Sequence, residues 1–362
     1  MLKIKVLVMD IPIGSGHKKA ADAIIDFLEL YDEIDVYRLS VFEFIPDFLA
    51  KFFLQMYLLS LKISPTIYKI LYGWGNSDKK STFWRDKLNC WLAKRACKRI
   101  VEINPDAVIA THATAGGIAS VLKKQGIINA KIYGVVTDYV MHKWWYYDNM
   151  NSYFTADIAI DKTSMGTTTK VAQYGIPIRK SFYTCQSNNK DLIKKNLNIK
   201  TDLPLCLIVG GGEGLLPMID FANSIGDGLC GYALLNITGR NISLLEKLNM
   251  LGCKEVFNYG YVENIQDYMH VSDVIISKAG GISSTEILAT SKPYIIYRPL
   301  PGQESKNADY LHKQYGVYVV SNINELKNCL LDINGMKNVF VYEKAKAAEL
   351  IVEDIWAEIK KS

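Results

Sequence analysis

Both halves of the chain open in the same way, with an apolar strand-like run, a glycine-rich turn and a helix-like segment. In the first half, residues 4–9 lead into the turn 13–17, and apolar spacing typical of a helix begins near Lys18. In the second half, residues 205–209 lead into a Gly-Gly-Gly-Glu-Gly run at 210–214, which is followed by another helix-like segment. A strand, a glycine turn and a helix in this order open a Rossmann-like unit. The repetition predicts two such units in tandem.

After each opening, strand-like and helix-like segments alternate, which predicts parallel sheets. The further strands are expected at 35–39, 107–110, 131–137 and 153–160, and then at 232–237, 256–259, 274–277, 294–297 and 317–320. A polar stretch at 186–201 is typical of a linker. We therefore predict an α/β fold with doubly wound domains at 1–185 and 202–340, and a C-terminal helix at 341–362 that can cross back to the first domain. Transferases, epimerases and sugar-binding proteins all share such an architecture.

Composition narrows the class of protein only a little. A length of 362 residues suits two domains, and a net charge of +5 permits an anionic partner without identifying one. The seven cysteines form no Cys-x-x-Cys pair, which is typical of reduced thiols in a cytosolic protein. The first residues do not resemble a signal peptide, and charges interrupt the most apolar region, 42–74, too often for a membrane-spanning helix. We expect no nucleic-acid partner.

The most informative motif of the second half lies at 277–288. A strand ends there, two glycines turn the chain and a helix begins, so that free backbone N–H groups favour an anion such as a diphosphate. Gly280 and Gly281 let the backbone approach such a ligand closely. Glu286, about one turn into the helix, suits two ribose hydroxyls. The same residues also fit a helix with a capping glutamate, and the motif alone does not separate the two interpretations.

A second loop, at 299–307, favours the ligand-binding interpretation. It follows another strand, and its prolines stiffen a segment that brings Gln303, Glu304 and Asn307 to the same edge of the sheet. Two amides and a carboxylate suit the hydroxyls of a sugar. The alternative is a plain turn at Gly302 with Glu304 in a first helical turn. The glycine run at 210–214 is a third anion site at this edge, although a lone glycine run is a weak signal.

Taken in order, the motifs resemble a known family. They are GSGH, THA, TD with a following His and Trp, GGGEG, GYV, SDVIISKAGG and PLPGQESKN. The string resembles the processive diacylglycerol glycosyltransferases and the plant-type monogalactosyldiacylglycerol synthases, and more distantly the transferase that adds N-acetylglucosamine to lipid I. The resemblance covers residues 5–316. It implies a GT-B fold, with two Rossmann-like domains facing a central cleft, an inverting mechanism, and no required metal or other cofactor. The chain has no Asp-x-Asp motif, which agrees with this expectation.

The resemblance also implies roles for residues of the second domain, which should bind a uridine diphosphate (UDP) hexose. Tyr261 and Val262 should flank the uracil, and Glu286 should hold the ribose. The phosphates should lie along Gly211, Gly212, Glu213 and Gly281, with Lys278, Gly280 and Thr285 in the same loop and helix start. Gln303, Glu304 and Asn307 should contact the hexose and the nearby phosphate.

The first domain should hold the acceptor, and two of its residues are candidates for the catalytic base. His17 lies at the start of the first helix, after Gly14 and Gly16, where the helix dipole favours a neutral imidazole. Asp138 follows the strand 131–137 and is either the base itself or the group that orients His17. His112 and His142 occupy similar loop positions, and the alternative for each histidine is a loop-anchoring hydrogen bond. The chain departs from the family at Ala113, where proline is usual, and after His142, where Lys143-Trp144-Trp145 replaces a His-Pro-x-Trp pattern.

A lipid acceptor gives a use to the apolar region and to the basic stretch that follows it. The region 42–74 includes Phe52, Phe53 and Trp74. The next segment, 79–99, carries Trp84 and Trp91 at helical spacing among many cations, Arg85 included, with Asp86 as its one acid. Apolar residues beside cations suit an anionic leaflet, and we also assign Trp144 to the acceptor side. We therefore expect peripheral attachment to the cytoplasmic face of the cell membrane. The alternative is a buried helix pair with a solvated basic face.

These observations predict an inverting transfer of a hexose from a UDP-sugar to diacylglycerol, or to a glycolipid already formed from it. The first alternative is transfer of N-acetylglucosamine to a lipid-linked cell-wall precursor. A nucleotide-sugar epimerase would need carboxylates around the sugar and no lipid-facing surface. A non-catalytic sensor would lack His17 and Asp138, which this chain retains. The pattern does not indicate which hexose is moved, how many are added, or an oligomeric state.

Overall fold

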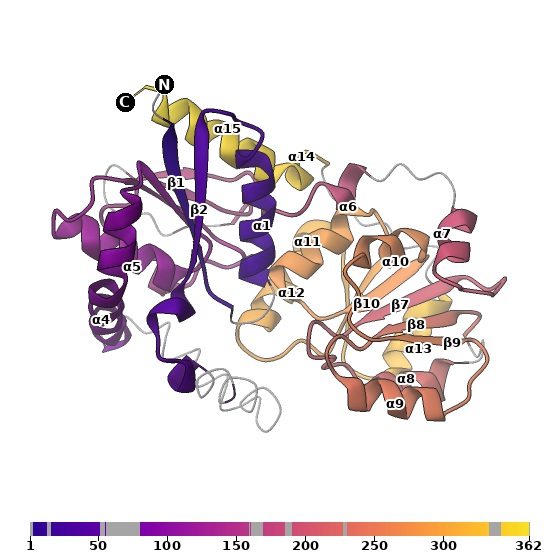
Figure 1. Cartoon of the computed structure of the whole chain (residues 1–362). Coiled ribbons are helices and arrows are strands. Elements are labelled where there is room, and N and C mark those ends of the chain that lie inside the picture. Colours follow the sequence, from indigo (N-terminus) through magenta and orange to yellow (C-terminus); the bar gives the residue numbers. More distant parts are fainter. Residues whose placement is uncertain are drawn as a thin grey trace. The chain divides into compact units, whose positions relative to one another are not determined.

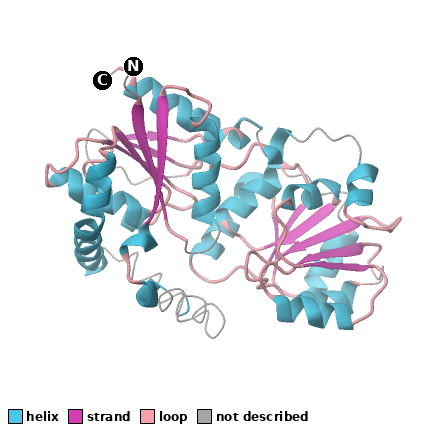
Figure 2. Cartoon of the chain, viewed as in Figure 1, coloured by secondary structure: helices cyan, strands magenta, loops and turns pink. Residues whose placement is uncertain are grey.

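The computed structural model describes residues 3–12, 16–50, 55, 80–158, 160, 169–184, 190–226, 230–332 and 342–361 (Figure 1). The chain divides into two compact units. Unit 1 comprises Met1–Arg179, Pro301–Gln303 and Glu343–Ser362, and unit 2 comprises Lys180–Leu300 and Glu304–Tyr342. Each unit is built on one parallel sheet with helices packed against it (Figure 2).

The sheet of unit 1 has the strand order β2-β1-β3-β4-β5-β6, and every neighbouring pair is parallel. The strands are β1 (Ile4–Asp10), β2 (Ile34–Ser40), β3 (Ala107–Ala110), β4 (Lys131–Val135), β5 (Ser152–Phe154) and β6 (Lys170–Ala172). The helices are α1 (Gly16–Leu28), α4 (Lys80–Ile103), α5 (Ala113–Lys124), α14 (Tyr342–Ala345) and α15 (Ala347–Ile359), with 3-10 turns η1 (Val41–Phe44) and η2 (Lys143–Trp145). The middle strands are mostly buried, because helices cover both faces of a parallel sheet.

The C-terminal helix α15 completes the core of unit 1. Its buried face, which includes Ile351 and Ile355, shares one apolar cluster with Ile24 and Leu28 of α1 and with Val8 of β1. Figure 1 shows α15 beside α1. Burial of a large aliphatic side chain contributes about 1.5–3 kcal/mol. The end of the chain is therefore an integral part of the first unit.

The sheet of unit 2 repeats the same design, in the order β12-β11-β10-β7-β8-β9, with parallel pairs throughout. The strands are β7 (Leu205–Val209), β8 (Ala233–Ile237), β9 (Val256–Tyr259), β10 (Val274–Ser277), β11 (Tyr294–Tyr297) and β12 (Tyr318–Val320). The helices are α6 (Ser181–Thr184), α7 (Lys190–Asn196), α8 (Met218–Ile225), α9 (Ile242–Met250), α10 (Ile265–Val271), α11 (Gly281–Ala289), α12 (Gln303–Tyr315) and α13 (Ile323–Leu331). Their apolar faces form a second core.

Each sheet has one point at which the winding of the chain changes direction. In unit 1 the first strand, β1, lies between β2 and β3, and in unit 2 the first strand, β7, lies between β8 and β10. The loops that leave the two central strands at such a point turn to opposite faces and leave a crevice between them, where ligands of open α/β sheets bind. The topology thus directs attention to the carboxyl ends of β1 and β3, and of β7 and β10.

The predicted α/β fold of two doubly wound units is confirmed, and most strands lie where the sequence placed them. The expected strands at 131–137 and 153–160 end earlier, at Val135 and Phe154, and the short edge strand β6 was not predicted. Helix α1 begins at Gly16, two residues before the expected start. Among the described residues, no helix is long and apolar enough to cross a membrane.

Candidate functional site

In unit 2, the loop that follows β7 is a glycine turn held by backbone hydrogen bonds. Leu215 N donates to Gly210 O at 2.9 Å, and Arg240 N, from the loop after β8, donates to Gly212 O at 2.8 Å. A Cβ atom at Gly214 would lie 2.4 Å from the Thr238 carbonyl oxygen, and Gly214 also has a positive φ of 59°. Glycine is therefore required at position 214 by the turn itself.

The neighbouring Gly211 and Gly212 have no such packing role. A Cβ atom added at either position would meet no other atom within 4 Å, although Gly211 has a positive φ of 74°. The half-buried Glu213 lies between these glycines and Gly214. The turn therefore presents an open stretch of backbone at Gly212, as an anion-binding loop must.

The loop after β10 lies next to this turn, because Ser277 pairs with Val209 in the register of the two strands. The Ser277 hydroxyl donates to Val209 O at 2.9 Å, and the Tyr294 hydroxyl donates to Lys278 O at 2.7 Å. Helix α11 then begins at Gly281, and its N-cap residue, Gly280, provides no side-chain cap. The first N–H groups of α11 are thus available to an anion.

The third predicted loop meets the second through side chains of α12. Lys278 Nζ forms an ion pair with Glu304 Oε1 at 2.5 Å, and Glu304 Oε2 accepts a hydrogen bond from Leu300 N at 3.0 Å. The buried Asn307 donates through Nδ2 to Ala279 O at 3.0 Å. Lys278, Glu304 and Asn307 therefore come together, and Gln303 is the first residue of α12.

Two of the predicted donor residues lie within α11. Glu286 is only 1% exposed, and Thr285 is also buried and donates through its hydroxyl to Gly281 O at 2.8 Å. Burial of a carboxylate is costly unless it finds polar partners, and Glu286 has such partners. Their predicted contacts with a nucleotide stay predictions.

The loop after β9 carries the residues predicted to flank the uracil. Tyr261 is exposed and Val262 is half-buried. The guanidinium of Arg240 lies 5.7 Å from the centre of the Tyr261 ring, and sequence reasoning missed this arginine. A usable signal existed, since Gly239-Arg240 follows the apolar strand β8 and so lies at the same sheet edge.

In unit 1, His17 lies at the carboxyl edge of the sheet, where the loops after β1 and β3 separate. Its Nδ1 atom is 2.9 Å from Thr111 O and 3.0 Å from the Thr137 hydroxyl oxygen. A carbonyl oxygen only accepts hydrogen bonds, so Nδ1 carries the proton and donates to Thr111 O. In the neutral ring the lone pair then lies on Nε2, which is the form that a general base requires.

Burial lowers the pKa of His17 below its usual value of 6.5, while the negative charges of Asp138 and Asp10 oppose this shift and raise the pKa. Burial is therefore the largest cause of the lowered pKa, and the contribution of the helix N-terminus stays a prediction. Asp138 is half-buried and follows β4, so it is close enough to act on His17. Asp10 was not predicted. It ends β1, is buried and forms an ion pair with Arg38.

The other two histidines anchor loops. His112 is the N-cap of α5 and accepts through Nδ1 from Thr114 N at 3.1 Å, and His142 caps η2 by accepting from Trp144 N at 3.2 Å. The ring of His112 lies edge-on to that of His17, with centroids 4.7 Å apart. Burial, together with the charges of His17 and His142, lowers the pKa of His112 well below its usual range. His17 and His112 thus form a pair of neutral imidazoles at this edge.

Helix α4 bears most of the described part of the predicted lipid-facing segment, which is also described at 42–50 and 55. Trp84 and Trp91 are 56% and 39% exposed, and cations lie over the rings, with Arg95 Cζ 4.6 Å from the centre of Trp91. The prediction for Arg85 was wrong: its side chain is buried against unit 1. Gly16 is the first residue of α1 and Trp144 is half-buried in η2. The predictions for Gly14, Phe52, Phe53 and Trp74 lie outside the described residues.

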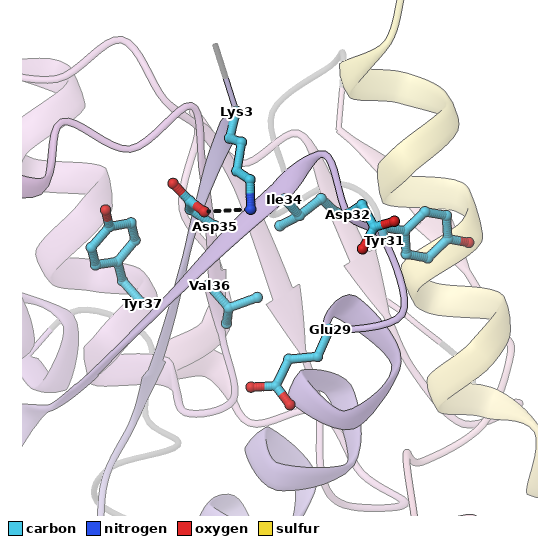
Figure 3. Close-up of a pocket in the computed structure, with 8 residues that line it drawn as sticks. All are labelled: Lys3, Glu29, Tyr31, Asp32, Ile34, Asp35, Val36 and Tyr37. Atoms are coloured by element: carbon cyan, nitrogen blue, oxygen red, sulfur yellow. Dashed lines mark ion pairs between the residues drawn. The ribbon is translucent and has the colours of Figure 1, made fainter. Parts of the chain in front are cut away.

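A pocket elsewhere on unit 1 contains none of these candidates. It lies along the edge strand β2 and the turn before it, where Lys3 Nζ pairs with Asp35 Oδ1 at 3.3 Å (Figure 3). Its other lining residues come from the same segment, 29–37. Among the described ranges, no three His, Cys, Asp or Glu side chains gather as metal ligands would.

Two family models together match most of the chain. Monogalactosyldiacylglycerol synthase matches residues 17–178, and the glycosyltransferase family 28 C-terminal domain matches residues 205–359. A processive diacylglycerol beta-glucosyltransferase of Bacillus cereus is 28% identical over 374 aligned positions, which cover 98% of this chain and 94% of that protein.

Solved structures show the same fold at low identity. MurG of Acinetobacter baumannii has a TM-score of 0.59 at 14% identity, covering 99% of this chain and 100% of that chain. HepE of Anabaena, in complex with UDP and glucose, has a TM-score of 0.55 at 12% identity and covers 99% of both chains. These likenesses show the GT-B fold. Motifs, fold and relatives agree, and the chain belongs to the family of processive diacylglycerol glycosyltransferases and monogalactosyldiacylglycerol synthases.

Proposed function

We propose that this protein transfers a hexose from a UDP-sugar to the free hydroxyl of diacylglycerol, or of a monoglycosyl-diacylglycerol, and forms a β-glycoside. The observation that carries the proposal is the meeting of three loops at one edge of unit 2. An open glycine backbone, an uncapped helix start and the Lys278–Glu304–Asn307 group lie at the switch point of the sheet. The Bacillus cereus relative is named for the same acceptor and for a β-linked product.

The donor loops offer complementary chemistry for each part of a UDP-hexose. The N–H groups at the start of α11 and the backbone at Gly212 suit the diphosphate. Lys278 adds a positive charge beside them, and its ion pair with Glu304 holds that carboxylate close to the same loop, where it can accept hydrogen bonds from sugar hydroxyls. Glu286 remains our candidate for the ribose, and Tyr261 with Val262 for the uracil.

His17 supplies the base in this proposal. Its Nε2 lone pair accepts the proton of the acceptor hydroxyl as the hydroxyl oxygen attacks the anomeric carbon. The new C–O bond forms on the face opposite the diphosphate, the anomeric carbon–phosphate oxygen bond breaks, and UDP leaves with the bonding electrons. A single displacement inverts the anomeric configuration. The start of α11 stabilises the charge that grows on the leaving diphosphate, so the step needs no metal ion.

Helix α4 provides the membrane-facing surface in this proposal. Its exposed apolar residues are Phe83, Trp84, Leu88 and Trp91. Cations lie over two of these rings, with Lys87 Nζ 4.5 Å from the centre of Phe83 and Arg95 Cζ 4.6 Å from the centre of Trp91. Such a mixture suits the headgroup region of an anionic leaflet, where each cation contributes about 1 kcal/mol. The acceptor is a membrane lipid, so we propose peripheral attachment at the cytoplasmic face.

The direct test is transfer itself. We expect purified protein, incubated with a radiolabelled UDP-hexose and liposomes containing diacylglycerol, to produce a labelled glycolipid whose linkage a β-glycosidase removes. Activity should persist in EDTA. UDP-glucose, UDP-galactose and UDP-N-acetylglucosamine are compared, the last also with a lipid-linked cell-wall precursor. Absence of labelled diacylglycerol product with every donor would refute the proposed function, and label on the precursor alone would support the alternative.

A pair of glycine variants tests the donor loop. Gly212→Ala should leave the melting temperature unchanged, since its methyl group meets no atom within 4 Å, but it should weaken UDP binding about tenfold by obstructing the backbone. Gly214→Ala should instead destabilise the protein by about 1–3 kcal/mol, because the added Cβ meets Thr238 O at 2.4 Å. Calorimetric titration with UDP and thermal unfolding measure both effects. Wild-type affinity in Gly212→Ala would remove this loop from the site.

The pH dependence of kcat/KM separates the two candidate bases. His17 acts as a base only when neutral, and burial lowers its pKa below 6.5. Activity should therefore be full above that pH and should fall as the pH drops through the lowered pKa. Asp138→Asn removes a charge that raises this pKa, so the acid limb should move to lower pH. His17→Ala should lower kcat/KM by about 10²–10⁴-fold. A comparable loss in Asp138→Asn, with little effect of His17→Ala, would make Asp138 the base.

Vesicle binding tests the surface of α4. The double variant Trp84→Ala/Trp91→Ala should bind anionic vesicles at least about tenfold more weakly, because burial of a large apolar side chain contributes about 1.5–3 kcal/mol. Binding by the wild type should also weaken as salt rises. Met250→Ala, which trims another exposed apolar side chain in unit 2, is the matched control. Equal co-sedimentation of both variants would place the membrane contact elsewhere.

A further inference from the structure

Helix α4 has a buried face that is unusual in carrying two polar side chains. The buried residues recur at helical spacing and begin with Arg85 and Asn89, before the apolar Leu92, Ala93 and Ala96. Figure 1 shows α4 and α5 as neighbouring helices of unit 1, and these two helices pack against each other. An apolar residue at each of these positions would satisfy packing alone, so the two polar groups call for another explanation.

Arg85 is buried beneath the segment that follows His142. Its Nη1 donates to Tyr146 O at 3.0 Å, and its guanidinium carbon lies 4.6 Å from the centre of the Tyr147 ring. Asp86 balances the charge, with Oδ1 at 2.7 Å from Nη2. The planar guanidinium thus fixes backbone and ring of one loop at the same time, which a lysine would not do.

Asn89, one turn further along α4, extends this network to α5. Its Nδ2 donates to the Tyr147 hydroxyl at 2.9 Å, and that hydroxyl donates in turn to Ala113 O at 3.1 Å. A Cβ atom at Gly117 of α5 would lie 2.2 Å from Asn89 Nδ2, so glycine is needed there for the helices to approach. Asn89 Oδ1 is buried without a hydrogen-bond partner among the described residues, a cost that stability alone does not explain.

The two ends of the network are the two loops that carry acceptor-side histidines. Tyr147 follows η2, which is capped by His142, and Ala113 begins α5, which is capped by His112. The His112 ring in turn lies edge-on to His17. Displacement of reacting groups by about 1 Å can reduce catalysis about 100-fold. A rigid connection at these two points therefore has a direct consequence for the geometry around His17.

We propose that Arg85, Asn89 and Tyr147 are positioning residues that hold the His112 and His142 loops in register with α4. The proposal rests on the proposed transferase function, and it gives α4 two roles on opposite faces. The outer face meets the lipid surface, and the inner face holds the loops beside the catalytic base. None of the three side chains touches substrate in this account.

Tyr147→Phe is the first test, since it removes one hydroxyl and keeps the ring that contacts the Arg85 guanidinium. We expect kcat for glycolipid formation to fall about tenfold, with the KM for the UDP-sugar and the affinity for UDP unchanged, because the donor loops lie in unit 2. Tyr174→Phe is the matched control. It removes a hydroxyl in the same unit that donates to Asp354 Oδ2 at 3.4 Å, and its kcat should equal that of the wild type.

Asn89→Ala gives an independent route to the same result, and the double variant tests whether the residues act as one network. If they do, Asn89→Ala/Tyr147→Phe should lose no more kcat than the worse single variant. A kcat for both single variants within twofold of Tyr174→Phe, or losses that multiply in the double variant, would overturn the network. Absence of transfer by the wild type would instead refute the proposed function itself, so the two failures are distinguishable.

Discussion

The position of every candidate residue depends on how two central strands pair in each sheet. β1 pairs with both β2 and β3, and β7 pairs with both β8 and β10, always in parallel. Parallel pairing brings all carboxyl ends to one edge, and the change in winding direction separates the loops there. The registers Met9–Ala110 and Val209–Ser277 then place the loop with His17 beside Thr111, and the glycine turn beside Lys278. The backbone hydrogen bonds between strands therefore determine which candidate residues lie close together.

At the first of these edges the backbone also selects the protonation state of the histidine. Thr111 O accepts from Nδ1 of His17 at 2.9 Å, which leaves Nε2 as the basic nitrogen. Burial then lowers the pKa, while Asp138 and Asp10 limit the fall. Arg38 forms an ion pair with Asp10 and so weakens the effect of Asp10 on the pKa of His17. The lowered pKa leaves the His17 imidazole neutral near pH 7, the form that the proposed general base requires.

Much of the fold and of the donor edge could be predicted from the sequence. Strands that are buried on both faces, such as Leu205–Val209 and Val274–Ser277, are continuous apolar runs and were placed correctly. The three-residue edge strand β6 is half-exposed and gives no such signal. Lys278, Glu304 and Asn307 follow predicted strands and do come together, because sheet topology alone brings those loops close.

What the sequence could not supply is the direction of side chains on a helix and the contacts between distant loops. Arg85 looked like one more cation in a basic run, yet it lies on the buried stripe with Asn89 and Leu92. Its partners, Tyr146 and Tyr147, are some sixty residues away. The lowered pKa of His17 could not be predicted for the same reason, since the burial that lowers it comes from packing around a switch point.

The two faces of α4 show why such contacts matter more than composition. Trp84 and Arg85 are adjacent in sequence, but one is exposed among cations and the other is buried beneath the loop after His142. A helix is rigid over a few turns, so the position of its outer face fixes the position of the loops that pack against its inner face. A lipid acceptor is presented at a membrane surface, and the base must meet its hydroxyl within hydrogen-bond distance. In the proposed function, a helix with the membrane on its outer side and the loops beside His17 on its inner side would satisfy this requirement with local contacts alone.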